Sequence, residues 1–334
     1  MGRLPLFAAS AHAVPGRLLP WLVAAMIDEA EFEQLVNPHR RELHAHCYRM
    51  LGSVADADDA LQEALLGAWR GFAGFEGRST LRSWLFRITT NACLQLLAAR
   101  PRRQLPFERS AAAEPDRPLE PLVEGPLWLE PYPHDPEAGF ELRESVELAF
   151  IAALQHLPPT QRATLILREV VGLSALEVAE LLDTSAPSIE SALQRARHAV
   201  QQRVPAQTQQ VTLRDLGSAA ERELVARFVT AWESRDPQAL LGLLTEDAKF
   251  GMPPIPNWFD GRADVVRFFA ERVFATPWRL HPLRASGQLA FACYQAPDFR
   301  LGALNVITLR GAAISELTGF LDPALHARFS LPER

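Results

Sequence analysis

A proline-rich stretch limits what this chain can fold into more than any other feature of its sequence. Residues 101–137 contain nine prolines and little apolar periodicity. Proline lacks a backbone N–H and fixes φ, so such a stretch neither continues a helix nor fits the middle of a sheet. We therefore interpret residues 101–137 as a linker. Residues 26–100 and 138–204 show helical periodicity, which predicts an all-α domain on each side of the linker.

A second break precedes the last part of the chain. Residues 205–218 read PAQTQQVTLRDLGS and are interpreted as a second, polar linker. Residues 219–334 mix amphipathic helical patterns with short strand-like runs at 303–309 and 313–317. The predicted fold class is therefore multidomain, with two all-α domains followed by an α+β domain.

The first 25 residues are interpreted as a disordered tail or a start-site extension, with Met26 as the native start. Prolines interrupt their apolar runs, so we expect neither a signal peptide nor a membrane span. The three cysteines lie far apart without a metal-binding spacing. A disulfide framework, a metal site and a cofactor are therefore not expected, and a cytoplasmic location fits.

The charge of the chain is unevenly distributed. A net charge of -6 excludes a generally basic nucleic-acid-binding protein, so any DNA-binding surface must be local. Residues 78–109 contain seven arginines and one acid, Glu108. Of the 34 basic residues in the whole chain, only Lys249 is a lysine.

An acidic helix is predicted from residue 54 onward. Ser53 followed by Asp56 resembles a capping box, and acids suit the positive end of a helix dipole. Leu61, Leu65 and Trp69 recur at helical spacing and form an inward stripe. A solvated helix face would explain the pattern without any partner. The outward side chains form an acidic and polar face: Asp58, Asp59, Gln62, Glu63 and Arg70.

A basic and aromatic helix follows within residues 75–103. Such a segment offers phosphate contacts, stacking surfaces and a polar group for base edges. Leu85 and Ile88 have the spacing of core residues, and Trp84 and Ala92 could share that role. The arginine excess is harder to explain as core packing. The candidate nucleic-acid contacts are Arg78, Arg82, Trp84, Arg87 and Asn91.

Together these two segments resemble region 2 of the extracytoplasmic-function sigma factors. The visible departure is Asp58, which stands in place of a glutamate and keeps the charge. The matching motifs are Tyr48–Ser53 (YRMLGS), Asp56–Asp59 (DADD), Gln62–Glu63 (QE), Ala68–Arg70 (AWR) and Ser79–Asn91.

The resemblance implies a role for each helix. The acidic helix would dock on the clamp helices of the largest subunit of RNA polymerase through Asp56, Asp59, Gln62 and Glu63. The basic helix and the loop before it would melt and read the −10 promoter element. Capture of a base from a melted strand requires pockets and stacking.

Residues 157–200 have the layout of a helix-turn-helix unit. Ser174 with Glu177 predicts a capping box, and Pro187 suits the first turn of the second helix. Other small helical hairpins could imitate this spacing. The predicted inward residues of the second helix are Ile189, Leu193, Ala196 and Val200. The predicted outward residues are Ser188, Glu190, Ser191, Gln194, Arg195, Arg197 and His198.

This segment resembles region 4 of the same sigma factors in Leu157–Arg162 (LPPTQR), Glu177–Leu182 (EVAELL) and Ser191–Arg197 (SALQRAR). Many relatives carry basic residues where this chain has Glu190 and Ala192. The resemblance implies a contact with the flap of the second-largest polymerase subunit and recognition of the −35 element in the major groove. The reading residues would be Ser188, Glu190, Ser191, Gln194, Arg195 and Arg197.

The linker itself carries a recognisable run, Trp128–Pro133 (WLEPYP), which is similar to one in extended sigma factors. A proline-rich segment is stiff and extended, which suits threading through a polymerase channel. An ordinary spacer would have the same composition.

Residues 219–334 resemble the SnoaL-like members of the NTF2-like superfamily, in which a curved sheet and helices form a cone-shaped domain around a cavity. Asp260 precedes Gly261 and fits a cap or turn, and His281 beside Pro282 fits a structural role, so no catalytic residue is expected. The candidate ligand pocket comprises Trp232, Phe250, Trp258, Asp260, Trp278 and His281.

Three functional interpretations remain. The first is a sigma factor that is regulated in cis by its C-terminal domain. Its expected partners are core RNA polymerase, promoter DNA and a possible small-molecule ligand in the C-terminal domain, without a membrane. The second is a ligand-sensing helix-turn-helix regulator, which would not need the acidic face of residues 56–63. The third is an enzyme with vestigial sigma domains, which would require turnover by the C-terminal domain.

Overall fold

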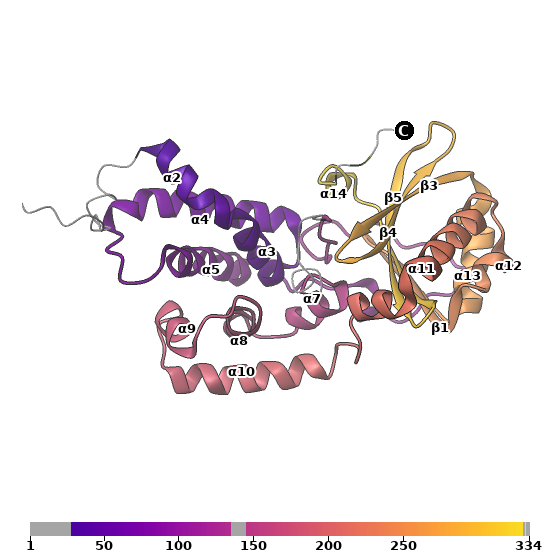
Figure 1. Cartoon of the computed structure of the whole chain (residues 1–334). Helices are drawn as coiled ribbons and strands as arrows, with labels where there is room; N and C mark the ends of the chain where they lie inside the picture. The colour runs from indigo at the N-terminus through magenta and orange to yellow at the C-terminus, as the bar shows by residue number, and fades with distance from the viewer. Residues whose placement is uncertain (1–27, 135–144, 330, 332–334) are drawn as a thin grey trace, which may run out of the picture.

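The computed structural model describes residues 28–134, 145–329 and 331. The N-terminal segment 1–25, with its predicted start at Met26, lies outside the described residues. Two helical domains lie beside each other, and the α+β domain forms the other end of the molecule (Figure 1). Within the described ranges, the structure contains no helix with the length and apolarity that a membrane span needs.

The first helical domain comprises residues 28–99. Side chains cap three of its helices. Asp28 and Glu31 form a capping box at the first helix, and Ser53 and Thr80 accept bonds from N–H groups in the first turns of the third and fourth helices. Gly52 ends the second helix at φ 70°, a conformation that glycine adopts without strain. The helices are α2 (Glu29–Val36), α3 (Arg40–Leu51), α4 (Val54–Gly71) and α5 (Leu81–Ala99), with short 3-10 turns η1 (Asn37–His39) and η2 (Phe72–Gly74).

The second helical domain, residues 145–204, confirms the predicted helix-turn-helix layout. The capping box of Ser174 and Glu177 is present, and Pro187 lies in the first turn of the last helix. All four predicted inward residues of that helix are buried. The helices are α7 (Leu148–Gln155), α8 (Pro159–Leu165), the π-helical turn η4 (Ile166–Val170), α9 (Ala175–Leu181) and α10 (Ala186–Gln201).

The C-terminal domain confirms the predicted α+β class. Its described residues form one sheet in the order β2-β1-β6-β5-β4-β3, in which β1 and β6 are parallel and the other neighbours antiparallel. The strands are β1 (Leu244–Met252), β2 (Ile255–Asp260), β3 (Trp278–Ala285), β4 (Gln288–Gln295), β5 (Arg300–Arg310) and β6 (Ala313–Phe320). The helical elements are α11 (Gln209–Glu233), α12 (Pro237–Leu241), α13 (Arg262–Glu271), η5 (Val273–Ala275) and α14 (Pro323–His326).

The structure corrects the prediction for residues 205–218, because helix α11 already begins at Gln209. Gly217, at φ 77° and ψ 153°, marks a kink rather than the end of a linker. The Gln209 side chain donates to the Leu309 carbonyl at 3.0 Å and accepts from the Leu309 N–H at 2.7 Å. The polar side chain of Gln209 is therefore buried against the sheet, whereas Gln207, Arg214 and Asp215 are exposed.

The two faces of the sheet have different neighbours. Phe291, Cys293 and Ile307 belong to a core with the aromatic residues of α11 and α13. The alternate residues, such as Ala290 and Leu304, belong instead to the core of the helical domains. Strand β4 is consequently buried from Gln288 to Tyr294, and part of this face of the sheet packs onto the helical domains.

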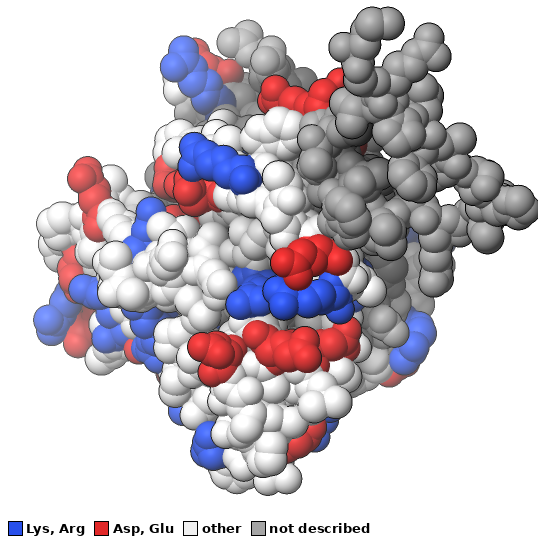
Figure 2. Space-filling view, turned by 90° about the vertical axis from the view of Figure 1, so that its left-hand side faces the viewer, with Lys and Arg blue, Asp and Glu red and all other residues white. Residues whose placement is uncertain are grey.

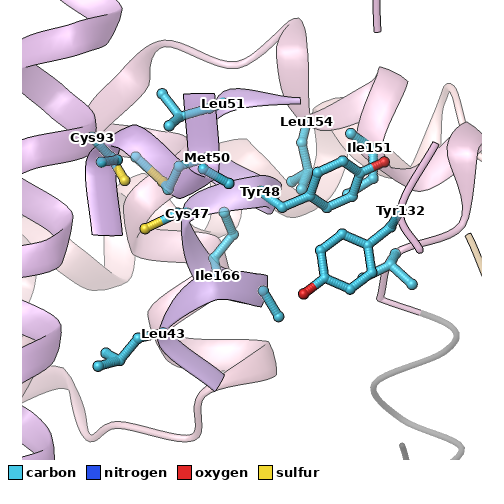
Figure 3. Close-up of a cluster of buried hydrophobic side chains, with 14 of the residues drawn as sticks. Leu43, Cys47, Tyr48, Met50, Leu51, Cys93, Tyr132, Ile151, Leu154 and Ile166 are labelled. Carbon is cyan, nitrogen blue, oxygen red and sulfur yellow. The ribbon is translucent and has the colours of Figure 1, made fainter. Parts of the chain in front are cut away.

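Tyr132 of the linker lies at the centre of this junction. Its ring centroid is 4.6 Å from that of Tyr48 on α3. Figure 3 shows the two tyrosines beside Ile151 and Leu154 of α7, in one cluster of buried side chains. The Tyr132 N–H donates to Ser286 Oγ at 2.9 Å, and the Ser286 N–H donates to the Tyr132 carbonyl at 2.7 Å. The linker thus joins the first helical domain to the β3–β4 turn.

Candidate nucleic-acid and partner interfaces

The acidic face of α4 is exposed as predicted. Asp58, Asp59, Gln62, Glu63 and Arg70 all project into solvent along this helix. A negative face of this kind can accept bonds and ion pairs from a basic partner surface.

Asp58, at the edge of this face, already has two partners. Its carboxylate lies 3.0 Å from His44 Nε2 and pairs with Arg328, which follows α14 in the C-terminal domain. Burial, aided by Arg328, lowers the pKa of His44 to about 4. The C-terminal domain therefore reaches the border of the predicted docking face.

Asp56 does not belong to the exposed face, which corrects its prediction as a surface residue. Its residue exposure is only 3%. The carboxylate accepts from Arg103 Nη2 at 2.5 Å and also pairs with Arg100. Both arginines lie where the chain leaves α5, so part of the arginine excess counted in the sequence is neutralised internally. Burial lowers the pKa of Arg103.

Glu130, in the middle of the WLEPYP run, caps α4. Its carboxylate accepts from the Val54 N–H at 2.8 Å and from Ser53 Oγ at 2.9 Å, where the helix dipole favours a negative charge. Tyr48 Oη donates to the Glu130 carbonyl at 2.6 Å. Sequence reasoning missed this role, because the partners lie more than 70 residues away. The only local signal was a single acid inside the run.

The predicted −10 residues lie partly in the loop before α5 and partly on α5 itself. Arg78 lies in the loop before α5, whereas Arg87 and Asn91 are exposed on the helix itself. Trp84 is half-buried, with its ring 5.0 Å from that of Phe75. These four residues lie on or next to one helix, at positions where all but Trp84 are open to a nucleic acid.

Arg82 is held by other parts of the protein. It donates to the Glu42 carboxylate at 2.8 and 3.0 Å and to the Val171 carbonyl at 3.2 Å. The neighbouring Ser83 Oγ lies 3.4 Å from Glu177. Val171 and Glu177 belong to the second helical domain, so this domain contacts the start of α5.

The outer face of α10 is exposed as predicted, at Ser188, Glu190, Ser191, Gln194, Arg195, Arg197 and His198. Glu190 pairs with Arg168 at 3.4 Å, and Arg197 pairs with Glu169 at 2.5 Å. Both pairs are solvent-exposed ion pairs, which contribute little to stability and are readily exchanged. The acidic Glu190 therefore has a neighbour that reduces its repulsion of phosphate.

A buried arginine fastens the two helical domains together. Arg162 donates to the Met50 carbonyl and, at 2.8 Å, to Gln155 Oε1. Burial lowers its pKa to about 10.

On the face shown in Figure 2, a row of basic side chains is bordered by acidic ones on both sides. The joined domains thus present mixed charge there.

The six candidate pocket residues do not come together. Trp232 and Phe250 are packed in the core, with ring centroids 4.8 and 4.9 Å from that of Phe269. Trp258 is covered by the linker, because its Nε1 donates to the Ser110 carbonyl at 2.8 Å.

Of the other three candidates, only Trp278 lies beside this core. Trp278 is half-buried beside Trp232, Asp260 is exposed at the end of β2, and His281 is exposed on β3. Aromatic side chains therefore occupy the interior where a pocket was expected. The described residues also contain no group of three or more histidine, cysteine or acidic side chains suited to a metal ion.

Comparison with known families agrees with this three-part architecture. The Sigma-70 region 2 family matches residues 35–103, the Sigma-70 region 4 family matches residues 147–200, and the SnoaL-like domain family matches residues 225–317. The fold and these matches together define a sigma factor with a SnoaL-like extension.

Full-length relatives identify the family. The chain is 41% identical over 315 residues to the ECF RNA polymerase sigma factor SigG of Mycobacterium tuberculosis H37Rv. The match covers 91% of this chain and 84% of SigG. It is 33% identical over 178 residues to SigM of the same strain, across 53% of this chain and 79% of SigM. The chain belongs to the ECF RNA polymerase sigma factors.

A solved structure shares the fold. The crystal structure of the Mycobacterium tuberculosis extracytoplasmic function sigma factor SigJ superimposes with a TM-score of 0.57 at 22% sequence identity. The match covers 91% of this chain and 100% of that one. The order of two helical domains and a C-terminal sheet is thus shared by another extended sigma factor.

Proposed function

We propose that this protein binds core RNA polymerase in the cytoplasm, recognises the −35 and −10 elements of a promoter and promotes its melting. The observation that carries the proposal is the exposed face of α4, where Asp59, Gln62 and Glu63 project together from a domain of the Sigma-70 region 2 family. A helix-turn-helix regulator acting alone has no need of such a face.

The proposed DNA contacts follow from exposure. Arg78, Arg87 and Asn91, with Trp84 as the stacking residue, would serve the −10 element. The exposed side chains of α10 would enter the major groove of the −35 element, where arginine and glutamine can bond base edges. Phosphate contacts by the arginines would make binding sensitive to salt.

We also propose that the linker and the C-terminal domain regulate this activity in cis by favouring a closed arrangement. The two promoter elements are roughly 25 base pairs apart, which is about 85 Å along B-form DNA. The two helical domains, by contrast, touch each other through Arg82 and Arg162. They must therefore separate before both elements can be read, and the contacts of Glu130, Tyr132 and Arg328 oppose that separation.

The C-terminal domain is proposed to act through contacts rather than through catalysis. Asp260 and His281, its best candidates for acid–base chemistry, are exposed and lie on different strands. The aromatic packing around Trp232 leaves the predicted pocket residues without a shared cavity. A ligand in this part of the molecule would need another site.

Promoter-dependent transcription with core polymerase tests the proposal. The variant Asp59→Ala/Glu63→Ala should lower polymerase affinity by roughly tenfold or more, since it removes two charges from the docking face. A matched control is Glu246→Ala, an exposed acid on β1. Unchanged polymerase binding by the double variant would argue for a regulator that acts without polymerase docking.

A further inference from the structure

A cavity lies outside the aromatic interior, where three parts of the chain meet. It has a volume of about 800 Å³ and is open to solvent on one side. The linker contributes Leu105 and Phe107, helix α7 contributes Ala152 and Ala153, and the sheet contributes Lys249 and Glu316. Ligand pockets in proteins have volumes in this range.

Lys249 is the one lysine among the 34 basic residues of the chain, and it lies in this cavity. Its Nζ is 5.8 Å from the centre of the Phe107 ring and 5.6 Å from that of Trp258, so both rings stabilise the ammonium. The ammonium also interacts with the charge of the neighbouring Glu316. An ammonium binds an anion as a point charge, whereas a guanidinium binds one through a planar fork of donors.

Glu316 is the cross-strand neighbour of Lys249, because the two residues are Cα partners in the parallel pairing of β1 with β6. Burial raises the pKa of Glu316 to about 7, even though Lys249 opposes the shift. Near neutral pH this carboxyl is therefore protonated in part of the molecules, and can then donate a hydrogen bond to an oxygen atom of a ligand.

Two acidic groups at the cavity have a partner of their own. Glu108 lies 2.7 Å from His156 Nε2, and Asp247 pairs with Arg310 at 2.9 Å. Arg203, on the rim, adds a positive charge. Lys249 and Arg203 thus supply positive charge to the cavity, whereas the wall that α7 contributes is apolar, with Ala149, Ala152 and Ala153.

We propose that this cavity binds a small amphipathic carboxylate, with its anionic group on Lys249 and its apolar body along Leu105, Ala152 and Ala153. The walls come from the linker, the second helical domain and the C-terminal domain, so an occupant would hold these parts together. On the proposed function of the protein, it would favour the closed arrangement and reduce initiation. The binding itself does not depend on that function.

The single lysine allows a site-specific test on the full chain with octanoate as the probe. Reductive methylation with ¹³C-formaldehyde labels Lys249 and the N-terminal amine only, so the NMR spectrum contains one side-chain dimethylamine signal. The expected result is a saturable shift of this signal on addition of octanoate. A shift that rises linearly with concentration, or the lack of any shift, overturns the proposal.

Variants locate the binding by isothermal titration calorimetry on unlabelled protein. Lys249→Gln should weaken octanoate binding by roughly tenfold or more, and neutral octanamide should bind the unchanged protein equally weakly. Glu246→Gln, on the same strand but outside the cavity, should leave the affinity unchanged. If Lys249→Gln loses its folded thermal transition, Ala153→Phe, which fills the apolar wall, replaces it. Unchanged octanoate affinity in the folded variant overturns the proposal.

Transcription assays separate the regulatory step from binding. With saturating octanoate, initiation should fall for the unchanged protein and stay constant for Lys249→Gln. Saturable binding without an effect on initiation would overturn the regulatory role and leave the site intact. If the protein binds octanoate but initiates no transcription even without octanoate, the proposed function is refuted instead.

Discussion

The two helices predicted to face DNA, α5 and α10, differ in what covers their polar sides. The outer side of α10 is open to solvent from Ser188 to His198, and its ion pairs are exposed ones. The start of α5 is held by Glu42 and by the second helical domain through Arg82 and Ser83. The second helical domain thus contacts the start of α5 and leaves the outer side of α10 open, so on the proposed function region 2 is the part that regulation would control.

The largest expected effect concerns the buried charges behind α5. Arg103→Met removes a buried partner of Asp56, so the free energy of unfolding should fall by about 3 kcal/mol. On α10, Arg195→Met should change it by less than about 0.5 kcal/mol, because Arg195 is exposed. Urea denaturation measures both values. Similar losses for the two variants would contradict the contrast between the helices.

A pH titration should reveal a second buried group against α5. His46 lies on α3 with its Nε2 2.9 Å from Thr90 Oγ1, and burial lowers its pKa to about 3. The unfolded chain takes up this proton below about pH 6.5 while the folded one does not, so stability falls as the pH drops. Between about pH 6.5 and pH 4.5 the loss should be roughly 2 to 3 kcal/mol.

The variant His46→Gln sharpens this prediction. Urea denaturation at the two pH values should show a weaker loss of stability for the variant, because its residue 46 takes up no proton in the unfolded state. An identical loss in both proteins would assign the acid sensitivity to other groups.

Arg82→Ala removes the hydrogen bond to the Val171 carbonyl, so it should loosen the contact between the helical domains by about 1 kcal/mol. Fluorescence energy transfer between labels on α4 and α10 should show a larger open population. Arg195→Ala should leave the energy transfer unchanged and weaken promoter binding instead. The slope of promoter affinity against salt concentration should fall by the amount expected for about one phosphate contact. Equal transfer in both variants would show that Arg82 does not hold the domains together.

The smallest expected effect is that of Arg328→Ala, which frees Asp58 at the edge of the α4 face. An exposed ion pair contributes roughly 0.5 kcal/mol, so polymerase affinity should rise by about twofold. The control is Arg300→Ala, which removes an exposed ion pair with Asp298 elsewhere in the C-terminal domain. A decrease in affinity would mean that Arg328 assists docking instead of competing with it.

Local sequence patterns were enough to predict most of the helices in the two helical domains, some of their caps and most of the faces they expose. The capping box of Ser174 and Glu177, the inward stripe from Ile189 to Val200 and the open face from Asp58 to Glu63 were all predicted correctly. These features depend on residues within one or two helical turns, and such neighbours are visible in a linear pattern.

How the segments are used depends on contacts between distant parts of the chain. Asp56 and Arg103 are 47 positions apart, so the burial of this acid could not be read from its own helix. The same holds for Glu130 as a cap on α4, for Gln209 as a partner of β5 and for Lys249 opposite α7. Charge pairing and burial are set by whichever segments pack together, and packing is a property of the whole fold.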